Sequence, residues 1–265
     1  MKKNKLIGSL VLVFSLGLIL AGCSSTSSSK KSVNQQSKKT VTVATTGVSY
    51  PSSYKSKGKL TGFDVDVAKA AAKKLGYKVK FTTTSFDGLF GQVTSGKADL
   101  IASTTAITPE REKQFYFSKP YAYFKYQVTV RKNSKLTNIN QLSGKTIAET
   151  AGSNQITALK KFNPKIKVKT YDDRDTVLNS VIDGKTDGYS NSGTIIAAII
   201  KQKNLPLKLL KGSYANENIA FTFAKDSHGK ALQKKFNKAV VELRKDGTLS
   251  KLSKKYFSGM DASHS

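Results

Sequence analysis

The feature that most restricts the fold of this chain is an alternation of strand-like and helix-like patterns that occurs twice. In the first occurrence, β-branched strand patterns at 40–45, 78–83 and 100–102 alternate with helical apolar stripes at 63–75 and 87–96. A turn is expected near 58–62, and Asp87 can cap the second of these helices. A strand–helix–strand rhythm of this kind predicts a parallel sheet with helices on both of its faces. The chain is therefore expected to fold as an α/β protein.

The same rhythm begins again after residue 130. Strand-like segments alternate there with helical ones, at 145–148, 153–162, 166–171, 177–182, 188–190, 195–200 and 207–210. Two further strand-like segments, 126–131 and 219–224, bracket this second unit, and the C-terminus is helical. We therefore expect one α/β unit inserted within another, as two lobes joined by two crossing strands.

The expected first lobe consists of 40–126 with 219–265, and the second of 127–218. Two lobes joined in this way can close on a ligand by bending at a hinge. Ligands of open α/β sheets bind outside the carboxyl ends of the strands. Both lobes would present those ends to one shared cleft.

The N-terminus indicates where the protein works. Three lysines among the first five residues precede an apolar run, 6–20. At roughly 15 residues this run is shorter than the ~20 that a membrane span needs, and it is typical of a secretory signal. Residues 20–23, Leu-Ala-Gly-Cys, resemble a bacterial lipobox, in which the cysteine is diacylated and becomes the new N-terminus. We expect 1–22 to be a lipoprotein signal peptide, with an ordinary signal peptide as the alternative.

Cys23 is the only cysteine in the chain, which excludes an internal disulfide. Residues 23–39 are almost entirely polar and are expected to form a disordered tether. Two acyl chains would hold the protein firmly at the membrane. The expected location is the extracellular face of a bacterial cell membrane.

The chain is strongly basic, with 45 Lys and Arg against 17 Asp and Glu, a formal net charge of +28. Such a chain is attracted to any anionic surface, whether nucleic acid, anionic lipid or cell-wall polymer. The expected extracellular address and the absence of an aromatic-and-basic binding module argue against nucleic acid as a partner.

Three motifs resemble the extracellular solute-binding proteins of family 3, the polar amino-acid receptors of ABC importers. The first is Gly-Phe-Asp-Val-Asp-Val at 62–67, and the second is Ile-Thr-Pro-Glu-Arg at 107–111 with Phe-Ser-Lys-Pro-Tyr at 117–121. The third is Asp-Gly-Thr at 246–248, followed by Leu252, Lys255 and Tyr256. The resemblance covers about residues 40 to 257.

The resemblance implies the two-lobed, type II periplasmic-binding-protein-like fold. It also implies capture of a polar amino acid, such as cystine or another sulfur-containing one, by a monomer without cofactor that delivers it to an ABC permease. A dehydratase-like enzyme on the same fold is disfavoured, because His228 and His264 are the only histidines and no catalytic triad order, metal-ligand spacing or phosphate loop is present. A surface adhesin working through positive charge stays as the second alternative.

Arg111 is the expected carboxylate clamp. Thr108 can cap a short helix and Pro109 suits its first position, so that Arg111 lies in the first turn, where the helix dipole disfavours a cation. A ligand carboxylate explains it, since a guanidinium binds a carboxylate through two parallel hydrogen bonds, and the matching Arg does so in the family. Asp64 and Asp66, at a helix start, are interpreted as capping residues with a structural role.

The resemblance implies that two more segments share the carboxylate. One is the loop before Arg111, with Thr104, Thr105 and Ala106, where the family usually has Ser or Thr at the last place. The other opens a helix whose free N–H groups favour an anion, with Thr150, Ser153 and Asn154. Simple helix capping is the alternative for the last two of these.

Aromatic walls and an amine site complete the expected cleft. Phe86 lies where the family stacks an aromatic on the ligand, and Tyr50 and Tyr54 lie in the first loop. Where the family places an Asp for the ligand's α-amino group, this chain has Ser192, preceded by Asn191. Either residue could accept a neutral hydrogen bond; otherwise the ammonium is held differently, or the ligand is not a standard α-amino acid.

Overall fold

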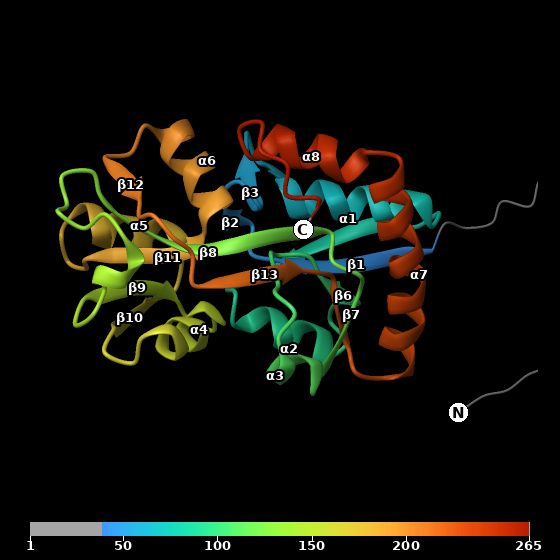
Figure 1. Cartoon of the computed structure of the whole chain (residues 1–265). Coiled ribbons are helices and arrows are strands. Elements are labelled where there is room, and N and C mark those ends of the chain that lie inside the picture. Colours follow the sequence, from blue (N-terminus) through green and yellow to red (C-terminus); the bar gives the residue numbers. More distant parts are fainter. Residues whose placement is uncertain (1–38, 265) are drawn as a thin grey trace, which may run out of the picture. The chain divides into compact units, whose positions relative to one another are not determined.

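The computed structural model describes residues 39–264 (Figure 1). The expected signal peptide, the lipid-bearing Cys23 and all but the last residue of the expected tether lie outside the described residues. No helix within 39–264 combines the length and apolarity needed to cross a membrane.

The first sheet has three parallel strands at one side and two antiparallel strands at the other. Its order is β5 (Lys78–Thr83), β1 (Thr40–Thr45), β6 (Leu100–Ile101), β14 (Thr222–Ala224) and β7 (Phe115–Phe117). β1 runs parallel to β5 and β6, whereas β14 is antiparallel to β6 and β7. The accompanying helices are α1 (Phe63–Lys74), α2 (Gly88–Thr94), α3 (Pro109–Glu112), α7 (Ser227–Lys245) and α8 (Thr248–Tyr256).

The second sheet repeats this plan. Its order is β10 (Lys167–Tyr171), β9 (Thr146–Thr150), β11 (Gly188–Ser192), β8 (Ala122–Arg131) and β12 (Leu207–Leu209), with β13 (Ala215–Ile219) also paired to β8. β9 runs parallel to β10 and β11, and β8 is antiparallel to its neighbours. The helices are α4 (Gln155–Phe162), α5 (Arg174–Ile182), α6 (Gly193–Lys203) and the short 3₁₀ helix η1 (Ile139–Gln141). The predicted α/β class with two parallel sheet cores is confirmed.

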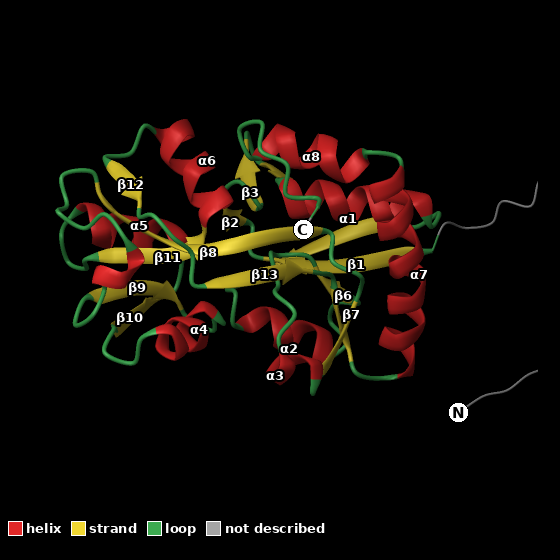
Figure 2. Cartoon of the chain, viewed as in Figure 1, coloured by secondary structure: helices red, strands yellow, loops and turns green. Residues whose placement is uncertain are grey.

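Two long strands connect the two sheets. β8 and β13 pair antiparallel from Ala122 opposite Ile219 to Tyr126 opposite Ala215. Ile219, the last residue of β13, also forms a β-bridge to Ala106, and its carbonyl accepts from the N–H of Tyr121 at 2.7 Å. Figures 1 and 2 show β8 and β13 lying side by side as they pass between the two groups of helices. The lobe boundaries at 126/127 and 218/219 stay predictions; they fall inside β8 and near the end of β13.

A small third sheet was not predicted. It is formed by β2 (Val48–Ser49), β3 (Ser53–Ser56) and β4 (Lys59–Thr61), of which β3 and β4 make a hairpin. The sequence pattern had indicated only a turn near residues 58–62. The segment is short and mostly polar, so it lacks the apolar alternation by which a strand is detected.

The 62–67 motif lies where α1 meets the loop before it. Gly62 has a φ of 131°, and a Cβ there would lie 2.3 Å from the carbonyl oxygen of Ser52, so only glycine fits. Phe63 is fully buried, and its ring lies 4.7 Å from that of Phe257. The motif therefore fixes α1 against the first loop and the C-terminal segment.

The capping role predicted for the two aspartates is wrong. The N-cap of α1 is Gly62, and no side chain caps this helix. Asp66 instead accepts hydrogen bonds from Lys255 at 2.9 Å and from the Tyr256 hydroxyl at 2.6 Å, and so joins α1 to α8. The structural interpretation holds, but the partners come from the third sequence motif.

Two other predicted caps are confirmed. The side chain of Asp87 accepts from the N–H of Gly88 at the start of α2. The hydroxyl of Thr108 accepts from the N–H of Arg111, and Pro109 is the first residue of α3. The helix predicted at 153–162 begins later, at Gln155, whose N–H is bound by the Ser153 hydroxyl at 3.1 Å.

Candidate functional site

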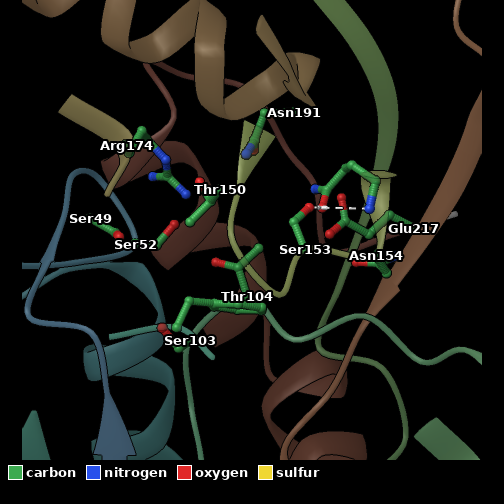
Figure 3. A pocket seen from close by; sticks show the side chains of 12 residues that line it. Ser49, Ser52, Ser103, Thr104, Thr150, Ser153, Asn154, Arg174, Asn191 and Glu217 are labelled. Atoms are coloured by element: carbon green, nitrogen blue, oxygen red, sulfur yellow. Dashed lines mark hydrogen bonds between the residues drawn. The ribbon is translucent and has the colours of Figure 1, made fainter. Parts of the chain in front are cut away.

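A polar pocket lies where the carboxyl ends of parallel strands from both sheets face one another (Figure 3). Its lining is dominated by hydroxyl and amide side chains, with one aromatic ring, one cation and one carboxylate. The lining residues are Ser49, Ser52, Phe86, Ser103, Thr104, Thr150, Ser153, Asn154, Gln155, Arg174, Asn191 and Glu217. The position agrees with the rule that open α/β sheets bind ligands at these ends.

Thr104 is the most constrained residue on the side of the first sheet. It follows β6 and has a φ of 48°, unusual for a β-branched residue. Its hydroxyl donates to Asp64 at 2.7 Å, and the same carboxylate accepts from the Tyr121 hydroxyl at 2.9 Å. Asp64 is fully buried, and that burial raises its pKa to about 6 against the lowering effect of these hydrogen bonds. The motif aspartate thus positions a pocket residue.

On the side of the second sheet, the turn after β9 carries Ser153 and Asn154. The Ser153 hydroxyl lies 3.3 Å from a carboxylate oxygen of the fully buried Glu149, and the amide of Asn154 contacts the Tyr126 hydroxyl. Burial raises the pKa of Glu149 well above its usual range. Side chains of β9 and β8 therefore hold this turn in position.

The guanidinium of Arg111 spans the two sides without lining the pocket. It donates to the carbonyls of Ala106 and Gly152, each at 3.2 Å, and lies 3.5 Å from Asn154 Oδ1. Its Cζ also stands 4.9 Å from the centre of the Phe90 ring and 5.7 Å from that of Phe86. Guanidinium has five N–H donors, so donors remain after these contacts. The clamp role stays a prediction.

Half of the predicted binding residues line the pocket: Phe86, Thr104, Thr150, Ser153, Asn154 and Asn191. The others lie behind or beside it. Thr105 and Ala106 are buried, and Tyr50 and Tyr54 pack edge to face with ring centres 4.9 Å apart. Ser192 is fully buried and caps α6.

Arg174 is a pocket residue that the sequence analysis missed. It is the first residue of α5, after the N-cap Asp173, and thus follows the carboxyl end of β10. It reaches across to donate to the Tyr50 carbonyl at 2.8 Å, while its Nε is buried without a hydrogen-bond partner in the described structure. Its position directly after a parallel strand was the sequence signal that could have identified it as a pocket residue.

Glu217 is the second missed residue. It lies on β13, where it pairs with Phe124, and only 3% of it is exposed. Burial raises its pKa to about 8, although the positive charges of Arg111 and Arg174 lower it. In Figure 3 Glu217 and Arg174 are seen on opposite sides of the pocket. The alternation of β13, with Glu217 between the inward-facing Ala215 and Ile219, was the signal that could have found it.

Within 39–264, no cluster of three or more His, Cys, Asp or Glu side chains is placed to hold a metal ion. His228 instead pairs with Asp99 at 2.8 Å, and neither residue is among those that line the pocket.

Comparisons with known proteins agree with this architecture. Residues 41–259 match the profile of the bacterial extracellular solute-binding proteins, family 3. The chain is 44% identical over 250 residues to the probable amino-acid-binding protein YxeM of Bacillus subtilis (strain 168). The aligned region covers 93% of this chain and 93% of YxeM.

Two solved structures share the fold. One, from work on glutathione import via GshT and the cystine ABC importer TcyBC of Streptococcus mutans, has a TM-score of 0.78 at 34% identity and covers 85% of this chain and 97% of that one. The other is the ancestral amino acid-binding protein AncCDT-1, a precursor of cyclohexadienyl dehydratase. It has a TM-score of 0.75 at 32% identity and covers 82% of this chain and 95% of that one.

Proposed function

Because this chain belongs to the bacterial extracellular solute-binding proteins of family 3, we propose that it captures a polar amino acid in the pocket between its sheets and delivers it to the permease of an ABC importer. The observation that carries this proposal is the pocket itself. Its lining comes from both sheets and is polar, with a cation and a carboxylate among it. Such a lining suits a small zwitterion.

Arg111 is the proposed carboxylate clamp. Its remaining N–H donors would act on the carboxylate together with Thr104 and the turn at 150–154, whose residues Thr150, Ser153 and Asn154 line the pocket. Thr105 and Ala106 would shape the loop that follows Thr104. Since Arg111 also donates to Ala106 and Gly152, on the two sides of the pocket, closure and carboxylate capture would depend on the same side chain. Phe86 would form the apolar wall, with Tyr50 and Tyr54 supporting the first loop.

Cystine, or another polar or sulfur-containing amino acid, is the proposed solute class. A polar lining with a single aromatic ring suits such side chains better than purely apolar ones. The likeness to a structure from work on a cystine importer supports cystine as the first candidate.

We also propose that the protein is a monomeric lipoprotein, anchored at the outer face of the cell membrane through Cys23. Its basic charge would then act on anionic polymers around it without being its main function.

The deciding experiment combines a ligand screen with a clamp variant. The chain from residue 24 to 265 is stripped of ligand and subjected to thermal shifts with amino acids, cystine, dipeptides and simple carboxylates. A ligand at 100 times its Kd stabilises the fold by about 2.7 kcal/mol, or about 5–10 °C in Tm for this size. We expect a hit among polar amino acids.

Arg111→Ala should weaken binding of that hit by at least about 30-fold, because a truncated buried charge pair leaves the ligand carboxylate uncompensated. Lys113→Ala is the matched control, since it removes an exposed cation next to α3. Undiminished binding by Arg111→Ala would remove the clamp from the proposal. No hit in the whole panel, with salt-sensitive attachment to anionic polymer, would favour an adhesin; turnover of a hit would favour a dehydratase-like enzyme.

A further inference from the structure

The usual place for amine recognition carries no charged group in this chain. Ser192 stands where the family resemblance expects an Asp, and its hydroxyl accepts from the N–H of Ile195 as the cap of α6. The neighbouring Asn191 accepts from the N–H of Ser192 at 2.8 Å through Oδ1 and donates to the Tyr189 hydroxyl through Nδ2. Both acceptors are engaged in local bonds, and neither carries charge.

Glu217 provides the carboxylate acceptor that the positions of Asn191 and Ser192 lack. It lines the pocket, it is 3% exposed, and its Oε2 is buried without a hydrogen-bond partner. Within the described chain no ion pair joins it to Arg111 or Arg174, the cations whose charges act on it. A buried acceptor of this kind costs free energy unless a partner arrives.

We propose that Glu217, on the crossing strand β13, receives the α-ammonium group of the ligand in place of the missing Asp. This inference rests on the proposed function and specifies how the amino group of an amino acid is recognised. A carboxylate oxygen and an ammonium group form a charge-assisted hydrogen bond, about twice as strong as a neutral one. Carboxylates without an amine would leave Glu217 unpaired and would bind more weakly.

The groups packed around Glu217 support a proton-linked version of this contact. Burial raises the pKa of Glu217, and the charge of Asp64 on α1 raises it further. The charges of Arg111 on α3 and Arg174 on α5 lower this pKa, as does the hydroxyl of Tyr126 on β8. Glu149 on β9 lies close enough for its charge and that of Glu217 to interact. The net result is a pKa of about 8. At neutral pH the empty site therefore holds a proton on Glu217, and an arriving ammonium group displaces that proton into solvent.

The test compares two α-amino acids with their counterparts that lack the amine. Calorimetry at about neutral pH measures L-glutamine against glutaramate and L-cystine against dithiodipropionate, for the wild type and for Glu217→Gln, in buffers of different ionisation enthalpy. The wild type should prefer the amino acid by at least about 30-fold and release protons on binding it. Glu217→Gln should lose most of that preference and the proton release, while its affinity for the des-amino acid changes little.

Two further variants keep the result interpretable. Glu217→Asp retains a carboxylate and should retain part of the preference for the amine. Glu242→Gln removes one exposed carboxylate on α7 and should behave as wild type.

The outcomes separate the two proposals. If Glu217→Gln keeps both the amine preference and the proton release, Glu217 does not hold the ammonium group, while the amino-acid receptor stands. If the wild type binds des-amino acids but neither amino acid, both the proposed substrate class and this role of Glu217 are refuted.

Discussion

The burial of Glu217 makes a quantitative prediction about the empty protein. A carboxyl group with an ordinary pKa of 4.5 has a pKa of about 8 in the folded chain. The folded state therefore binds this proton more tightly than the unfolded state. Its contribution to stability is fully present below pH 4.5 and is lost as the pH rises through 8.

Integrating that linkage between about pH 5.5 and about pH 8.5 gives a loss of about 3 kcal/mol in the free energy of unfolding. For a domain of this size the loss corresponds to about 6–12 °C in Tm. Glu217→Gln cannot ionise and should not suffer this loss. The variant, stripped of ligand, should gain about 3 kcal/mol over the wild type on going from the lower to the higher pH.

Urea unfolding followed by circular dichroism at several pH values measures the difference directly. Asp64 and Glu149, whose pKa values are also raised by burial, act in the same direction but are present in both proteins, so their effect largely cancels. Glu242→Gln, which removes an exposed carboxylate, should follow the wild type at every pH. Parallel pH profiles for wild type and Glu217→Gln would refute the argument that Glu217 is protonated in the folded, empty pocket.

The remaining predictions concern one buried carboxylate and the membrane anchor. Asp64→Ala should lower the free energy of unfolding by about 2–4 kcal/mol, because the hydroxyls of Thr104 and Tyr121 lose their shared acceptor. Asp64→Asn should lower the free energy of unfolding by less. Equal urea midpoints for the wild type and both variants would contradict the role assigned to this carboxylate. In cells expressing the full chain, Cys23→Ala should abolish incorporation of labelled palmitate and release the protein from the membrane fraction; a membrane-bound, labelled variant would exclude Cys23 as the anchor.

The fold could be predicted because its signals are local. Most strands of the two parallel cores carry β-branched residues, and the longer helices carry apolar stripes of their own, such as the one from Phe63 to Leu75. The β3–β4 hairpin was not predicted because its residues are polar and few. The partners of Asp64 were not predicted for another reason. They lie 40 and 57 positions away in the sequence, and periodicity and capping rules relate only residues that are close in sequence.

The site was predicted to the extent that it follows the ends of the parallel strands. Phe86, Thr104 and Thr150 all lie at such ends, and they line the pocket. Arg174 obeys the same rule, but as a cation in the first turn of a helix it was not considered, although Arg111 had been singled out on that ground. Glu217 does not follow the rule, because it comes from a strand that connects the sheets.

The position of Glu217 also explains why its chemistry is hard to anticipate. A charged residue at an inward position of a strand normally argues against a buried strand, since burying an unpaired carboxylate costs several kcal/mol. A glutamine at this place would avoid that cost and keep the shape. The chain instead retains a carboxylate at the pocket, with Ser192 in the place of the usual Asp and two arginines within electrostatic reach. An anionic ligand without an amine can pair with the arginines but leaves Glu217 without a partner, whereas a zwitterion can place its carboxylate toward the arginines and its ammonium toward Glu217. The free energy lost in the empty pocket is then recovered only by a ligand that carries both charges, and this selects amino acids over simple carboxylates.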